Sequence, residues 1–143
     1  MRLHGPRRGD WVPLLPERTR MLVIMAVPAE ALFRSYDYLT PDVDGTSSSL
    51  TVVERMMPIE AWGAVCGIVA VVTLWGLILR WPRTAIAGFR LGGATYTLLA
   101  AGQWIAVFHN PWLDGIRGAA IVTLFALAYW GLAKGYTDQI RSR

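Results

Sequence analysis

The chain has 143 residues, and its 14 basic and 10 acidic side chains give it a net charge of +4. This length fits one domain or one small helical bundle. The basic excess is small and scattered, so the composition argues against a nucleic-acid partner and favours arginines that lie beside a lipid bilayer. The hydrophobic residues, 54% of the total, concentrate after position 60.

An N-terminal segment, residues 1–52, comes before the apolar part. Within it, residues 16–39 place apolar side chains at helical spacing, which predicts an amphipathic helix on the membrane surface or on the bundle. The predicted apolar face consists of Met21, Leu22, Met25, Ala29, Leu32, Phe33 and Tyr36.

The same segment allows a second interpretation. Residues 1–31 have some features of a cleaved signal peptide, because Ala29-Glu30-Ala31 has the small-x-small form of a cleavage site. Residues 40–51 are turn-formers and small polar residues, which predict a linker.

Three uncharged stretches follow within residues 53–143: Ala61–Leu79, Leu91–Phe108 and Gly118–Ala133. The first has nineteen residues, and as a helix it would extend about 28 Å, close to the thickness of a bilayer core. It also lacks the polar face that a soluble helix needs. The sequence therefore predicts an all-α integral membrane protein with three transmembrane helices and a short charged tail. The expected spans are about 60–79, 88–108 and 114–133.

Positive charge predicts the orientation of these spans. The connection over residues 80–90 and the tail carry more arginine and lysine than the opposite side does, so both are expected in the cytoplasm, with the N-terminal segment outside. The expected location is the cell (inner) membrane. The residues on the basic side are Arg80, Arg83, Arg90, Lys134, Arg141 and Arg143, against Arg55 and Arg117.

Aromatic and basic side chains near the span ends are expected to lie at the headgroup level of the membrane. These interface anchors are Trp62, Arg80, Trp81, Arg83, Trp112 and Trp130. Well inside a span, Gln103 and Tyr96 fall on one helical face. A buried amide needs partners, so these two are expected to bond between helices or, alternatively, to line a water-filled lesion or channel.

Small residues at four-residue spacing predict close helix contacts, since they let two backbones approach within a membrane. Gly63 and Gly67 form such a pair in the first span, and Gly93, Thr97 and Ala101 form a stripe in the second. The contacts could lie within one chain or between copies of it.

No motif of a catalytic, cofactor or metal site stands out. His4 and His109 are the two histidines, and they lie far apart, while the single cysteine, Cys66, lies in the first span. No Asp, Glu, Lys or Arg lies in the middle of a predicted span, which argues against a proton relay or an ion-coupled transporter. We therefore expect a protein that is not an enzyme, with no cofactor.

Three apolar spans, short connections and a charged tail ending Gln139-Ile140-Arg141-Ser142-Arg143 resemble the layout of three-span phage holins. The run from Met56 to Lys134 is similar to small membrane proteins of actinobacterial phages. The resemblance implies assembly into lesions of the inner membrane, with the N-terminus outside.

Two functions follow. The first is a non-catalytic membrane subunit or assembly partner, acting through helix packing and the membrane-surface segment. The alternative is a holin-type lesion former. The expected partners are the lipid bilayer and either further copies of the chain or another membrane protein.

Overall fold

The computed structural model describes residues 16–40, 57–109 and 116–142. Within these ranges the chain is all-helical, as predicted, with four helices and no strand. They are α1 (Glu17–Leu39), α3 (Ile59–Ile78), α4 (Pro82–His109) and α5 (Arg117–Arg141). Most of the linker and the residues Trp112, Arg55, Arg143 and His4 lie outside the described ranges.

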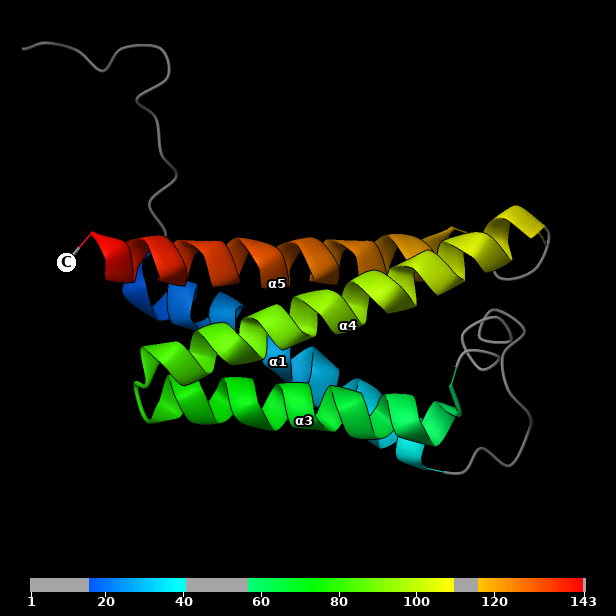
Figure 1. The fold of residues 1–143 in the computed structure, drawn as a ribbon, viewed down its shortest axis with the longest axis horizontal. Helices are drawn as coiled ribbons and strands as arrows, with labels where there is room; N and C mark the ends of the chain where they lie inside the picture. Colours follow the sequence, from blue (N-terminus) through cyan, green and yellow to red (C-terminus); the bar gives the residue numbers. More distant parts are fainter. Residues whose placement is uncertain (1–15, 41–56, 110–115, 143) are drawn as a thin grey trace, which may run out of the picture.

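The helices form an antiparallel bundle (Figure 1). Helix α3 packs against α1 on one side and α4 on the other, α5 packs along α4, and α5 also touches α1. Helices α1 and α4 run in one direction, and α3 and α5 run in the other. The start of α1, the α3–α4 turn and the end of α5 consequently meet at the same end of the bundle.

Three of the described helices, α3, α4 and α5, are long and apolar enough to cross a membrane. They correspond to the three predicted spans, and they indicate a multi-pass membrane protein. The helices α4 and α5 are longer than the predicted spans, since α4 begins before residue 88 and α5 continues to Arg141.

The prediction that residues 80–90 connect two spans is wrong from Pro82 onward, because α4 begins at Pro82. Two features make the turn this short. The Trp81 N–H donates to the Gly76 carbonyl at 2.8 Å, with Arg80 in the left-handed conformation (φ 55°), as in a Schellman helix end. Pro82 then occupies the first position of a helix, where its missing N–H is not needed.

Helix α1 is present as predicted, but the predicted apolar face is not the one that packs. Leu22, Phe33 and Tyr36 of that face are 72%, 75% and 73% exposed. The face against the bundle consists of Ile24, Val27, Ala31, Ser35 and Tyr38. Apolar residues occupy both sides of the helix, so their spacing alone could not identify the buried one.

The largest fully buried side chains are aromatic rings from α4 and α5. Tyr96 and Tyr129 are fully buried, with ring centroids 5.1 Å apart, and Phe89 lies 6.1 Å from Tyr129. Glycines bring the helices close enough for this packing. A Cβ on Gly88 would lie 2.8 Å from the Thr73 Cα, so α3 and α4 are in backbone contact there.

Candidate functional site

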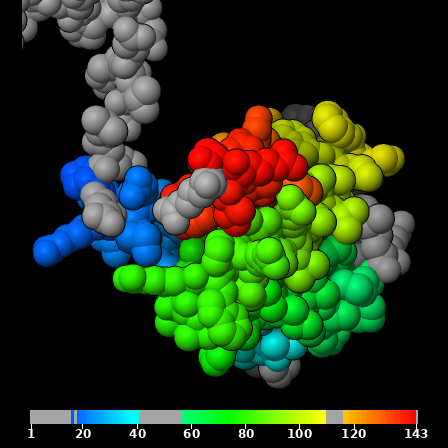
Figure 2. All heavy atoms as spheres, turned by 60° about the vertical axis from the view of Figure 1, so that its left-hand side comes forward, coloured from blue at the N-terminus to red at the C-terminus, as the bar shows by residue number. Residues whose placement is uncertain are grey.

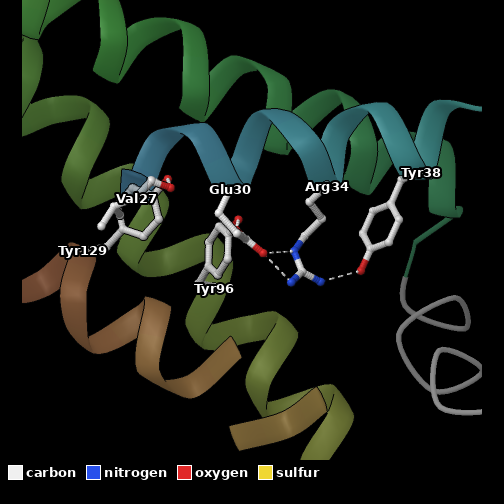
Figure 3. Close-up of polar contacts among 6 residues, drawn as sticks. All are labelled: Val27, Glu30, Arg34, Tyr38, Tyr96 and Tyr129. Atoms are coloured by element: carbon white, nitrogen blue, oxygen red, sulfur yellow. Dashed lines mark hydrogen bonds and ion pairs between the residues drawn. The ribbon is translucent and has the colours of Figure 1, made fainter. Parts of the chain in front are cut away.

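Three polar residues follow one side of α1 at four-residue spacing (Figure 3). The Arg34 guanidinium donates to one carboxylate oxygen of Glu30 through Nε at 3.0 Å and Nη2 at 2.5 Å. Its remaining nitrogen, Nη1, donates to the Tyr38 hydroxyl at 3.0 Å. The four-residue spacing places these side chains one helical turn apart, which is what an intrahelical ion pair requires.

Two tyrosines bring α4 and α5 to this part of α1. The Tyr96 hydroxyl, from α4, donates to the second carboxylate oxygen of Glu30. The Tyr129 hydroxyl, from α5, donates to the Val27 carbonyl at 3.3 Å. Figure 3 shows both rings reaching α1 from the neighbouring helices. We call Glu30, Arg34, Tyr38, Tyr96 and Tyr129 the charged cluster.

The charged cluster lies near the middle of the bundle and is largely buried. Tyr96 is close to the midpoint of α4, and the side chains of Glu30 and Arg34 are only 21% and 17% exposed. The guanidinium also lies over the rings of Tyr38 and Tyr96, with its carbon 5.8 Å and 5.7 Å from their centroids. Such contacts favour a cation in a poorly hydrated place.

A shallow hollow of about 370 Å³ lies beside the ion pair, lined by Glu30, Phe33, Arg34, Tyr36 and Asp37. It is open on the outer side of α1, so the carboxylate and guanidinium keep some access to the surroundings. Both Glu30 oxygens are nevertheless engaged, one by Arg34 and one by Tyr96. The cluster is therefore an internally satisfied network, which holds three helices together.

Metal binding has no support in the described ranges, where no three His, Cys, Asp or Glu residues lie close enough to share an ion. Cys66, near the middle of α3, is fully buried and unpaired with another cysteine. It packs as a small apolar residue.

The glycine pair of the first span packs against α1 of the same chain. A Cβ on Gly63 would lie 3.0 Å from Tyr38 Cβ and Leu39 Cγ, and one on Gly67 would lie 2.7 Å from Ser35 Oγ. Of the two predicted alternatives, the contact within one chain accounts for both glycines.

The second small-residue stripe divides between two environments. A Cβ on Gly93 would lie 2.7 Å from the Trp130 ring, and the Trp130 indole N–H donates to the Thr97 hydroxyl at 3.2 Å. Gly93 and Thr97 therefore pack against α5. Ala101, the third member, is exposed.

The predicted buried polar residues are both buried, but they do not share a partner. Tyr96 bonds to Glu30, whereas Gln103 Oε1 has no hydrogen-bond partner among the described residues. Of the predicted interface anchors, Trp62 is buried in the core and does not face the surroundings. Those that the structure describes as exposed are Arg80, Trp81, Arg83 and Trp130.

Sequence reasoning missed the charged cluster. Its one sequence signal is the pair Glu30 and Arg34, four residues apart in an otherwise apolar stretch. The partners Tyr96 and Tyr129 are remote in the chain, so no local pattern could indicate them. Comparisons with protein-family models, curated proteins and solved structures found no match to this chain.

Proposed function

We propose that the protein is a non-catalytic, four-span membrane protein that serves as a subunit or assembly partner of a membrane complex. The observation that carries this proposal is the Glu30–Arg34 pair, held at mid-bundle by Tyr96 of α4. The pair makes α1 an integral part of the bundle and leaves no free acid or base in the part of its interior that the structure describes.

Three features of α1 support a membrane-crossing helix. Its 23 residues extend about 34 Å, enough for a bilayer core of about 30 Å. Its outward side carries exposed apolar residues, including Leu22 and Phe33, which suit contact with lipid. Its inward charges are paired, which is the form in which ionisable residues are tolerated within a membrane.

Four spans also give a simple orientation. Among the described residues, one end of the bundle carries seven arginines and lysines outside the charged cluster, and the other end carries Arg117. The positive-inside rule then favours a cytoplasmic location for the basic end. The start of α1 and the C-terminal end of α5 would both lie in the cytoplasm, in place of the opposite-sided termini of a three-span protein. The seven are Arg18, Arg20, Arg80, Arg83, Arg90, Lys134 and Arg141.

Cysteine labelling tests the crossing of α1. In a Cys66→Ala background, single cysteines replace Thr19, Thr40 or Ser142, which are all exposed at helix ends. Intact cells that express each variant are then treated with a membrane-impermeant maleimide. We expect labelling from outside at position 40 alone. Positions 19 and 40 reacting from the same side would show that α1 lies on the surface, and would refute the four-span arrangement.

A second experiment tests the role. We expect purification in a gentle detergent to co-isolate a second membrane protein at constant stoichiometry, and inducible expression in bacteria to leave the membrane potential intact. Recovery of the chain alone would contradict the subunit role. An abrupt collapse of the potential would refute it in favour of the holin-type lesion former.

A further inference from the structure

We propose that the basic end of the bundle binds an anionic phospholipid in the groove between α1 and α5. The headgroup phosphate would lie between Arg20 and Arg80, and an acyl chain would run along the glycines of α5. This inference rests on the proposed crossing of the membrane by α1, because only then do both arginines lie at headgroup level.

Two adjoining hollows form the groove. The larger, of about 480 Å³, is lined by residues that include Arg80, Leu77 and Ala85. The second, of about 330 Å³, is lined by residues that include Arg20 and Ile24. The two hollows are neighbours, because Met21, Tyr136 and Gln139 line both of them. Figure 2 shows the elements around them together at this end: the first turns of α1 in blue, the α3–α4 turn in green and the last turns of α5 in red.

The charge of the groove suits a phosphate. Arg20 and Arg80 reach it from two different elements, Gln139 and Tyr136 add neutral polar groups, and no acidic residue is among the described residues that line either hollow. Basic pockets between transmembrane helices on the cytoplasmic side are typical sites for anionic headgroups.

The deeper part of the groove suits an acyl chain. Gly131 and Gly135 of α5 line it together with Ile24 and Leu132, and a Cβ on either glycine would meet no described atom within 4 Å. Gly131 lies eight residues before Gln139, which places it about 12 Å deeper along the helix axis. That offset along the helix axis would place Gly131 beside the acyl chain of a lipid whose headgroup lies near Gln139.

A lipid fits this groove better than a second copy of the chain does. A parallel copy related by a two-fold axis along the membrane normal would bring its own basic end to the same level. Arg20, Arg80 and their equivalents would then face like charges, which opposes association. An anionic lipid neutralises the same charges.

Arg80 adds an independent indication. It has a φ of 55°, a conformation that favours glycine and disfavours every residue with a Cβ. The turn therefore keeps an unfavourable backbone conformation at a residue that lines the larger hollow.

Native mass spectrometry of the purified chain tests the site. The probes are phosphatidylglycerol and phosphatidylcholine with identical acyl chains, supplied together in neutral detergent. We expect phosphatidylglycerol to be retained preferentially. The variant Arg20→Gln/Arg80→Gln should weaken its binding about 30-fold, which corresponds to about fivefold for each arginine. The matched control is Arg18→Gln/Arg83→Gln, which removes the same charge from the same end outside the two hollows and should change binding less than about twofold.

A third variant, Gly135→Leu, fills the apolar part of the groove without changing the charge, and it should reduce retention of both lipids. Equal retention of the two lipids by the wild type, or equal losses in the two double variants, would overturn the proposal. A lipid-free dimer that Gly135→Leu abolishes would also overturn it, in favour of a second copy. Because the labelling experiment tests α1 separately, a spanning α1 with no lipid preference would refute this site alone.

Discussion

Removing the positive charge from the charged cluster is the most informative perturbation of the bundle. The substitution Arg34→Met deletes two hydrogen bonds to Glu30 and one to Tyr38, and it leaves Glu30 with Tyr96 as its one partner in the cluster. An unpaired carboxylate then remains in the middle of the bundle. Breaking a buried ion pair in this way costs about 3–5 kcal/mol in typical proteins, and we expect about 3 kcal/mol here because about a fifth of each side chain is exposed.

The double variant Glu30→Gln/Arg34→Met separates the cost of an orphaned charge from the value of the pair. The amide oxygen that it introduces at position 30 can still accept the Tyr96 hydroxyl, and methionine replaces much of the volume of the arginine. Since neutral replacement of a buried pair is often neutral in stability, we expect the double variant within about 1 kcal/mol of the wild type. The coupling between the two sites would then be at least about 2 kcal/mol, and any cost of Glu30→Gln alone adds to it.

The assay is equilibrium unfolding in mixed micelles by increasing SDS, followed by far-ultraviolet circular dichroism. The control is Arg18→Met, an exposed residue at the start of the same helix, which should change the free energy of unfolding by less than about 0.5 kcal/mol. A loss below about 1 kcal/mol for Arg34→Met, or a double variant equal to the sum of the single ones, would refute the reasoning.

Three further outcomes follow from the glycines and from the α3–α4 turn. In the same unfolding assay, Gly88→Ala should destabilise the bundle by about 1–3 kcal/mol, because its Cβ would meet the backbone of α3. Gly135→Ala should stabilise the bundle by about 0.5–1 kcal/mol, because its Cβ would meet no described atom and alanine is the better helix former. Gly118→Ser should stabilise the bundle more than Gly118→Ala does, since a hydroxyl there can donate to the unpartnered Gln103 oxygen, 3.4 Å from the Cβ position; a larger gain from Gly118→Ala would show that helix propensity alone matters. Arg80→Gly should raise stability by about 1 kcal/mol by relieving the positive φ, and yet weaken phosphatidylglycerol binding in mass spectrometry; unchanged lipid binding would separate Arg80 from the groove.

The small residues show how far local patterns reach. Gly63 and Gly67 could be identified as packing residues from their spacing, because close backbone approach needs small side chains wherever it occurs. Their partner could not be identified, since spacing says nothing about which helix approaches. The structure places Tyr38, Leu39 and Ser35 of α1 there.

The sequence by itself determined the class of the protein and its three apolar spans, because uncharged stretches long enough to cross a bilayer are a property of consecutive residues. It also predicted a helix over residues 16–39, where the structure has α1 (Glu17–Leu39). It did not determine the side on which that helix packs, because α1 is apolar on both sides. Only the tertiary structure decided that Glu30 and Arg34 lie inside the bundle, since the hydroxyl that satisfies the second Glu30 oxygen belongs to Tyr96, 66 residues away along the chain.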